Sequence, residues 1–262
     1  MKFKVLASGS KGNCTYVETS SKRILIDIGT TSLNIEKKLR ANNIEPDSID
    51  AILITHTHVD HISGLKVFSK KYSPIVYMTE KMEKELSFTP DNLVNIVGEI
   101  NLDELRIIPI KISHDVEDAN GYIVEDNNSS LVYITDTGYV NEKYHDLLKN
   151  KNAYIFESNH DVEKLMNNPK YPHQTKIRIL SDKGHLSNKD SAYYLSKFIG
   201  NNTKYVVLAH LSEENNCPEL ATSTLVETLN NYEIDFNNIL VAQQSGIDEV
   251  FEVWLKLYVL EN

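Results

Sequence analysis

The sequence has few of the residues from which disulfide frameworks and thiolate metal sites are built. Its 262 residues include two cysteines, Cys14 and Cys217, which lie far apart and form no Cys-x-x-Cys pair. Small secreted scaffolds and thiolate zinc sites depend on more cysteines at closer spacing. The chain fits neither of these classes.

Long hydrophobic runs are also missing. No segment approaches the roughly 18 consecutive apolar residues that a membrane helix needs. The first residues carry positive charge, but a small and polar stretch, residues 8–13, follows them in place of an apolar one. We therefore expect no secretory signal and no membrane partner, and we predict a cytoplasmic protein.

Positive charge is in deficit. The 27 Lys and Arg residues face 37 Asp and Glu residues, which gives a formal net charge of −10. This balance argues against general affinity for polyanions, although a local basic patch or a bound metal pair could still attract nucleic acid. The composition, 41% hydrophobic and 24% charged, is that of a globular protein, and we expect a single domain over residues 1–262.

Apolar segments of strand length alternate with segments of helical periodicity, which predicts an α/β fold with buried sheets covered by helices. The expected strands are residues 3–7, 15–18, 23–28, 51–55, 75–78, 105–112, 121–124, 131–135, 153–157, 204–209 and 238–242. The expected helices are residues 33–41, 64–72, 80–86, 139–149, 187–199 and 219–230. Residues 91–105 carry no motif. Three expected strands lead directly into His56, Asp136 and His210.

The most informative segment follows the strand at residues 51–55. It places His56, His58, Asp60 and His61 within six residues, and Gly64 follows shortly after. Imidazole and carboxylate groups are the usual ligands of zinc and related divalent ions. In an extended loop His56 and His58 point the same way and can bind one ion, while Asp60 and His61 turn toward a second. The alternative is a polar loop whose histidines only cap the next helix, and the dense spacing favours the metal site.

This segment resembles the signature of the metallo-β-lactamase superfamily, and residues 26–29, 113–115, 135–138 and 209–212 resemble the family's other motifs in the family's order. The resemblance implies a four-layer αβ/βα sandwich. It also implies one metal held by His56, His58 and His114, a second held by Asp60, His61 and His210, Asp136 between the two, and Asp27 bracing the loop.

Residues 6–13, 156–161, 179–188 and 208–216 are further similar to the bacterial WalJ/YycJ branch of that superfamily. That branch is associated with nuclease activity, notably 5′–3′ exonuclease action on DNA. The resemblance therefore implies nucleic acid, with DNA favoured, as the substrate.

Several other residues are candidates for the site. Ser8 and Asn13 flank a glycine-containing loop that either binds phosphate oxygens through its amides or forms a tight hairpin turn. Ser187 begins the helix expected at residues 187–199 and is a candidate substrate contact. Glu157 and His160 are candidates for contacts behind the ligands, although His160 is equally compatible with a buried, hydrogen-bonded histidine.

Asp60 and His185 are the candidate catalytic residues. Two cations would hold a hydroxide that is nucleophilic at neutral pH, so no side-chain nucleophile is needed. His185 lies just before a helix start, where an anion is favoured, and it could donate a proton to a leaving oxygen. The alternative is that His185 only caps the helix.

Two rival functions remain open. A small-molecule hydrolase acting on a lactone, thioester or cyclic phosphodiester would use the same ligands, and a non-catalytic metal-binding scaffold would keep them. The donor set suits zinc, and manganese and iron are compatible with it.

Overall fold

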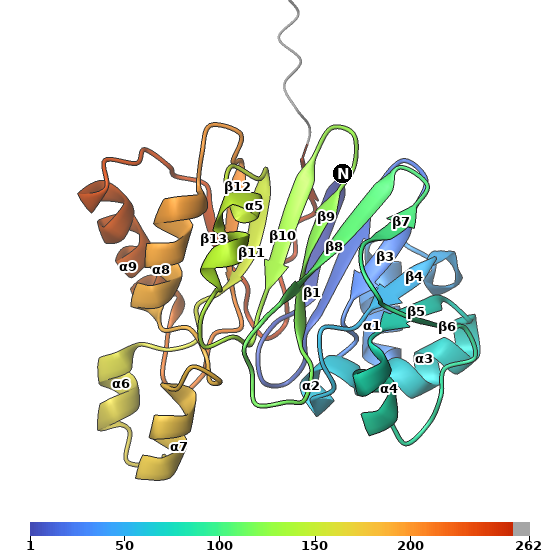
Figure 1. The fold of residues 1–262 in the computed structure, drawn as a ribbon, viewed down its shortest axis with the longest axis horizontal. Coiled ribbons are helices and arrows are strands. Elements are labelled where there is room, and N and C mark those ends of the chain that lie inside the picture. Colours follow the sequence, from blue (N-terminus) through green and yellow to red (C-terminus); the bar gives the residue numbers. More distant parts are fainter. Residues whose placement is uncertain (254–262) are drawn as a thin grey trace, which may run out of the picture.

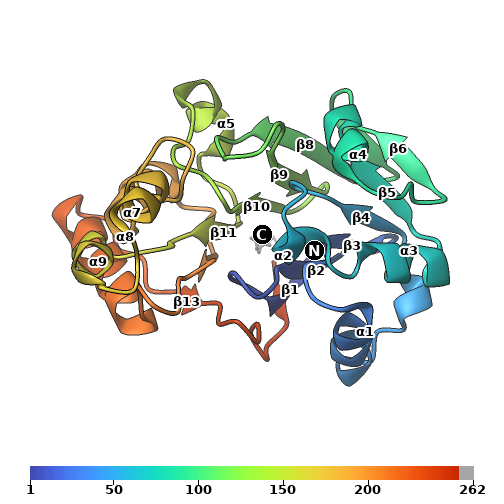
Figure 2. The ribbon, with the colours of Figure 1, turned by 90° about the horizontal axis from the view of Figure 1, so that it is seen from below.

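The computed structural model describes residues 1–253 and shows two β-sheets packed face to face, with helices on both outer sides (Figure 1). In the described residues each sheet has seven strands. Viewed along the sheets, α1, α3 and α4 lie outside one sheet, and α8 and α9 lie outside the other (Figure 2). The predicted four-layer α/β sandwich is therefore confirmed.

The first sheet has the strand order β14-β1-β2-β3-β4-β5-β6. Its strands are β1 (Lys2–Ala7), β2 (Cys14–Glu18), β3 (Arg23–Ile26), β4 (Ala51–Leu53), β5 (Ile75–Met78), β6 (Leu93–Asn95) and β14 (Phe251–Glu252). The pairs β14–β1, β1–β2 and β2–β3 are antiparallel, and the pairs from β3 to β6 are parallel. Parallel pairing brings the carboxyl ends of β3, β4 and β5 to one edge of the sheet.

The second sheet has the order β13-β12-β11-β10-β9-β8-β7. Its strands are β7 (Ile100–Leu102), β8 (Leu105–Lys111), β9 (Asn120–Glu125), β10 (Ser130–Ile134), β11 (Ala153–Glu157), β12 (Tyr205–Ala209) and β13 (Ile239–Val241). The pairs from β7 to β10 are antiparallel and those from β10 to β13 are parallel. The carboxyl ends of β10, β11 and β12 therefore share one edge.

The helices divide between the two halves of the molecule (Figure 1). Those next to the first sheet are α1 (Ser32–Ala41), α2 (Val59–Ile62), α3 (Leu65–Tyr72) and α4 (Glu80–Glu85), with the 3-10 turn η1 (Pro46–Ser48). Those of the second half are α5 (His145–Leu148), α6 (Val162–Asn167), α7 (His173–Ile179), α8 (Asn188–Phe198) and α9 (Pro218–Asn231), with the 3-10 turn η2 (Glu142–Tyr144). None of the helices in residues 1–253 is long and apolar enough to cross a bilayer.

Three apolar layers hold the sandwich together, and alternation along each strand builds them. On β10, Leu131 and Tyr133 pack between the sheets, whereas Val132 and Ile134 face the outer helices. On β3, Ile24 and Ile26 pack between the sheets and Leu25 faces α1 and α3. Successive side chains of a strand point to opposite faces, so a strand that is apolar on both faces is buried in the middle of such layers.

The predicted elements agree with most of the structure, but the helix expected at residues 139–149 is wrong. Only η2 and the short α5 form there. The Asn141 side chain accepts from the Lys143 amide and begins η2, and Lys149 is already extended. The expectations also missed β6, β7, α6 and α7, because these short edge strands and short helices carry few periodic apolar positions.

Gly29, which follows β3, packs closely against the loops of Asp60 and Asn13. This packing gives a first prediction. A Cβ at Gly29 would lie 1.6 Å from the Asp60 carbonyl oxygen and 2.5 Å from the Asn13 amide nitrogen. We expect Gly29→Ala to lower the free energy of unfolding by about 1–3 kcal/mol or more, the usual cost of overpacking. Urea denaturation measures this.

The matched control is Gly98→Ala, because a Cβ at Gly98 meets nothing within 4 Å. We expect this variant to stay within about 0.5 kcal/mol of wild type. Equal stability of the two variants would contradict the packing argument.

Candidate metal centre and active site

The candidate site lies where strands of both sheets end. His56 and His114 follow β4 and β8, while Asp136 and His210 follow β10 and β12. The loops after these strands gather near α2 at the lower edge of the sandwich (Figure 1). The fold therefore brings residues from four separate segments to one place.

Three residues at these strand ends have a left-handed backbone. Asp27, Asp136 and His210 have φ angles of 60°, 58° and 55°. Asp and His are among the residues that adopt this region most readily, yet each such residue costs roughly 1–3 kcal/mol. Five other non-glycine residues of the described chain share this conformation outside the ligand segments, so the strain is a feature of the site but not confined to it.

The first group of candidate ligands is His56, His58 and His114, whose donor atoms all lie within 4.8 Å of one another. His114 Nε2 and His58 Nδ1 are 3.2 Å apart. His56 is fully buried, whereas His58 is partly exposed at the mouth of the site. This is the set that the sequence assigned to one metal.

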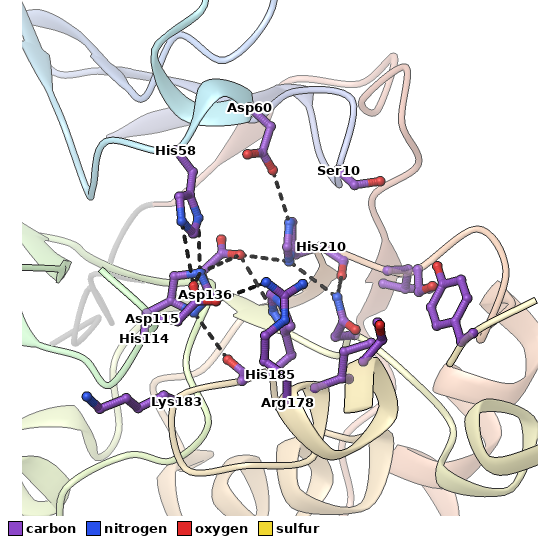
Figure 3. A pocket seen from close by; sticks show the side chains of 17 residues that line it. Ser10, His58, Asp60, His114, Asp115, Asp136, Arg178, Lys183, His185 and His210 are labelled. Atoms are coloured by element: carbon purple, nitrogen blue, oxygen red, sulfur yellow. Dashed lines mark hydrogen bonds and ion pairs between the residues drawn. The ribbon is translucent and has the colours of Figure 1, made fainter. Parts of the chain in front are cut away.

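The second group is Asp60, His61 and His210, whose donor atoms also lie within 4.8 Å of one another. The Asp60 Oδ2 atom is 3.7 Å from His61 Nε2 and 3.8 Å from His210 Nε2. Asp136 lies between the groups, with Oδ2 at 3.1 Å from His61 Nε2 and Oδ1 at 3.9 Å from His114 Nε2. Figure 3 shows His58, Asp60, His114, Asp136 and His210 pointing toward one another.

Hydrogen bonds on Nδ1 fix the orientation of four of these histidines. His56 Nδ1 is 3.0 Å from Thr55 Oγ1, and His61 Nδ1 is 2.8 Å from Asp27 Oδ2. His114 Nδ1 is 3.3 Å from the Gly184 carbonyl oxygen, and His210 Nδ1 is 3.0 Å from Glu157 Oε1. Each contact holds the proton on Nδ1 and directs the lone pair of Nε2 into the site, as oxygen partners of metal-binding histidines do.

The donor atoms fit a divalent cation. Within residues 1–253, His56 Nε2, His210 Nε2 and Asp136 Oδ2 are buried and make no hydrogen bond. Buried polar atoms without partners are costly, and cations bound at the two ligand groups would satisfy all three. Five imidazoles with carboxylates form the nitrogen–oxygen set that suits zinc and its neighbours.

The charges around His61 also support a cation site. Burial disfavours the charged imidazole, but the carboxylates of Asp27 and Asp136 outweigh burial and raise the pKa of His61 to about 10. The centre between these carboxylates therefore attracts positive charge, which a proton or a metal ion can supply.

Glu157, at the end of β11, holds two histidines from behind. Its Oε1 accepts from His185 Nδ1 at 2.8 Å and from His210 Nδ1 at 3.0 Å, while Oε2 accepts from the Thr137 and Leu186 amides. Burial favours its neutral form, but the charge and hydrogen bond of His185 lower the pKa of Glu157 to about 2. Asp136, Glu157, His185 and His210 also lie close enough to hold an ion. Because both Glu157 oxygens are already occupied, we interpret Glu157 as a brace for the two histidines.

A cavity of about 260 Å³ opens over the candidate ligands. Six predicted site residues line it: His58, Asp60, His114, Asp136, His185 and His210. Its walls also contain residues that were not among the predicted site residues, Ser10, Asp115, Tyr171, Thr175, Arg178 and Lys183 among them. Figure 3 shows Arg178 and His185 together on the side of the cavity opposite Asp60.

Comparison with known proteins identifies the family. Residues 22–211 match the family model described as "Beta-lactamase superfamily domain". The chain is 37% identical over 258 residues to exodeoxyribonuclease YycJ of Bacillus anthracis, covering 96% of this chain and 93% of the relative. It is 39% identical over 237 residues to exodeoxyribonuclease WalJ of Streptococcus pneumoniae, covering 87% and 88%. The chain belongs to the metallo-β-lactamase superfamily.

A solved structure agrees with this assignment at the level of the fold. The metallo-β-lactamase fold protein YhfI from Bacillus subtilis superposes with a TM-score of 0.70 at 14% identity, covering 95% of this chain and 98% of that one. Together with the relatives, the family match makes the protein a metal-dependent hydrolase of the metallo-β-lactamase fold.

Three predicted substrate contacts of this superfamily member are engaged in contacts within the protein. Ser8 and Asn13 are buried; Ser8 Oγ accepts from the His210 amide at 2.8 Å, and Asn13 Nδ2 lies 3.0 Å from His61 Nε2. Gly12 donates to the Gly9 carbonyl, so the loop between them is a tight turn. Ser187 is buried as the N-cap of α8, where its Oγ accepts from the Asp190 amide. These contacts support the metal loops and the helix, which argues against direct substrate contact by Ser8, Asn13 and Ser187.

His160 is buried, but it is not the hydrogen-bonded histidine that the sequence left open. Neither ring nitrogen has a hydrogen-bond partner within the described residues, and burial lowers the pKa of His160 to about 4. Its backbone pairs with Ser187, and its carbonyl accepts from the Asn188 amide. Its contribution is therefore to join β11 to the start of α8.

Thr55 is the supporting residue that the sequence did not reveal. Its Oγ1 lies 2.9 Å from Asp27 Oδ2 and 3.0 Å from His56 Nδ1, so it links the brace to a ligand. Its position in the sequence is the one signal that could have identified it. Thr55 is the last residue before the histidine motif, and its hydroxyl points opposite to the buried Ile54. Tyr171, Thr175 and Arg178 of the cavity wall lie outside the motifs identified in the sequence, so no spacing marked them as site residues.

Thr55→Val gives a prediction for metal binding, because it removes the hydroxyl and keeps the shape. We expect the affinity for zinc to fall by about 10- to 100-fold, the range for losing such a supporting contact. Competition with a chromophoric chelator measures the affinity.

Thr15→Val is the matched control. The Thr15 hydroxyl is buried on β2 and has no hydrogen-bond partner in the described part of the chain. We expect wild-type zinc affinity for this variant. Equal affinities for the two variants would remove Thr55 from the support of the centre.

Proposed function

We propose that this enzyme is a dinuclear metal-dependent phosphodiesterase that acts as a 5′–3′ exonuclease on DNA. The relatives at 37% and 39% identity that cover most of the chain are exodeoxyribonucleases by name, which supports this substrate. The observation that carries the phosphodiesterase proposal is the Glu157–His185 pair, in which Glu157 Oε1 and His185 Nδ1 are 2.8 Å apart. The pair lies next to both ligand groups. DNA in preference to RNA, and a cytoplasmic location, stay predictions.

The chain offers two metal sites with a shared carboxylate. His56, His58 and His114 would hold one ion, Asp60, His61 and His210 the other, and Asp136 would contact both. When bound, two divalent cations lower the pKa of water toward neutrality and neutralise charge on phosphoryl oxygens. Zinc fits the donor set best, and manganese and iron are compatible with it.

His185 supplies the proton in the proposed mechanism. Its Nδ1 donates to Glu157 Oε1, which fixes the ring and leaves Nε2 as the nitrogen free to face the substrate. The side chain is 20% exposed at the cavity wall, whereas Glu157 is fully buried. An imidazole whose other ring nitrogen is held by a carboxylate is an established acid for protonating a leaving oxygen.

Asp60 completes the arrangement opposite His185. Its carboxylate lines the cavity and is 25% exposed, which makes it the most accessible carboxylate among the ligands. It can accept a hydrogen bond from the attacking water while it holds its cation. Water would thus enter on the Asp60 side and the leaving group would depart on the His185 side.

Hydrolysis of a small molecule is the second candidate, and the size of the cavity favours it. A volume of about 260 Å³ is just below the roughly 300–1,000 Å³ of typical small-ligand pockets. The net charge of −10 also favours a substrate smaller than a polyanion.

An end-labelled nuclease assay tests the proposed function. The protein, loaded with zinc or manganese, is incubated with single- and double-stranded DNA and RNA labelled at the 5′ or the 3′ end. We expect two metal ions per chain by elemental analysis, and immediate release of short products from 5′-labelled DNA. Hydrolysis of small esters or cyclic phosphodiesters without cleavage of nucleic acid would instead establish the rival function.

His185→Ala tests the assignment of the acid. We expect both metals to stay bound and the rate on DNA to fall by about a hundredfold or more, mainly in kcat. A nitrophenyl phosphodiester needs little acid assistance, so the variant should recover much of its rate on that substrate.

His173→Ala is the control for this variant, because His173 is exposed at the start of α7. It should keep the wild-type rate on both substrates. A wild-type rate of His185→Ala on DNA would remove His185 from the mechanism. A loss of rate that is equal on both substrates would show that His185 positions the substrate and donates no proton.

A further inference from the structure

The segment from the C-terminal half of α7 to Gly184 forms a rigid wall of the cavity. Its backbone packs on the family motifs: the Gly184 carbonyl is 3.3 Å from His114 Nδ1, and a Cβ at Gly138 would lie 2.3 Å from the Asp182 carbonyl oxygen. The His185 amide donates to the Ile179 carbonyl at 2.9 Å, which closes the segment on itself. Side chains on this wall are therefore held at a fixed place relative to the candidate metal ligands.

The wall carries Arg178 and Lys183, the only Arg and Lys side chains that line the cavity in the described structure. Of the three carboxylates that line it, Asp60 and Asp136 belong to the ligand groups, and the third, Asp115, pairs with Arg178 at 3.2 Å. The Lys183 ammonium makes no ion pair within residues 1–253. Figure 3 shows Arg178 and Lys183 on the same side of the cavity.

We propose that Arg178 and Lys183 hold the phosphates that neighbour the scissile phosphate, so that they position one unpaired strand of nucleic acid. This inference rests on the proposed nuclease function and deepens it. A cavity of about 260 Å³ has room for one unit of a strand at a time. The phosphates on either side of that unit would then lie at the rim, where Arg178 and Lys183 are exposed.

Arg178 can exchange Asp115 for a phosphate at little cost. The side chain of Arg178 is 66% exposed, and water screens an exposed ion pair, which makes the pair weak. A guanidinium binds two oxygens of a phosphate in a forked geometry that no lysine reproduces. Asp115 Oδ1 also lies 3.3 Å from His114 Nε2 and 3.6 Å from His58 Nε2, so a cation held by these histidines would lie close to Asp115 and compensate its charge after the exchange.

The ion pair is not needed to hold the wall in place. The backbone contacts of Gly184, Asp182 and Ile179 already fix the segment, whereas the Arg178 side chain reaches across the mouth of the cavity. A structural latch would be buried and well packed, and Arg178 is neither. Its placement is that of a group available to a ligand.

The test is the salt dependence of binding to a single-stranded DNA made with phosphorothioate linkages, which the metal-loaded enzyme cuts slowly. The dissociation constant is measured by fluorescence anisotropy over a series of salt concentrations. For Arg178→Gln and for Lys183→Gln we expect binding to weaken about tenfold, with a loss of about 0.7 from the logarithmic salt slope per phosphate contact. The double variant should lose about twice that slope.

Two further variants are needed. One separates the effect of guanidinium geometry from the effect of charge, and the other separates the cavity site from general surface charge. Arg178→Lys keeps the charge, so it should retain the slope but not the full affinity. Arg106→Gln is the matched control, because Arg106 is likewise exposed and ion-paired, with Glu99, but lies on β8 at the end distant from His114. It should bind like wild type.

The outcomes distinguish this proposal from the function on which it rests. Wild-type salt slopes in both Arg178→Gln and Lys183→Gln would overturn the proposal, while the nuclease function would stand. Equal loss of slope in Arg106→Gln would also overturn it, since the effect would then be general surface charge. A wild-type enzyme that neither binds this strand nor cuts DNA would overturn the proposed function and this inference together.

Discussion

The buried carboxylate of Asp27 is the contact on which the site depends. It accepts hydrogen bonds from the amide and hydroxyl of Thr55, and it lies 2.8 Å from His61 Nδ1. Burial raises the pKa of Asp27, and only the charge and hydrogen bonds around it compensate for the lost hydration. The Tyr133 hydroxyl of the second sheet reaches the same carboxylate at 3.5 Å. One side chain therefore ties the ligand loop to both sheets.

The rest of the centre is unfavourable without a cation. Asp136 and His210 adopt strained left-handed backbones, and buried donor atoms such as His56 Nε2 have no hydrogen-bond partner in the described chain. The apolar layers on both faces of each sheet stabilise the scaffold enough to hold these groups together. Metal binding then satisfies the polar atoms, so the stability of the site and its occupancy are coupled.

The sequence predicted what periodicity and local spacing determine. Apolar alternation located the central strands, and the spacing of His56 to His61 located a ligand loop. It could not predict side-chain direction: Ser8 Oγ contacts the His210 amide and Asn13 Nδ2 contacts His61 Nε2, so both side chains contact candidate ligand residues. It also gave no role to Thr55, because the link to Asp27 joins strands that meet only in the folded sheet.

The net negative charge of the chain is compatible with a polyanionic substrate, because charges on the protein surface act over short distances. At physiological ionic strength, exposed charges are screened over roughly 8 Å, so distant acidic side chains act weakly on a phosphate in the cavity. Near the site, Arg178 and Lys183 stand next to ligands whose negative charge bound metals would reverse. The negative remainder of the surface would then oppose unspecific binding along nucleic acid, whereas a strand placed in the cavity would meet positive charge.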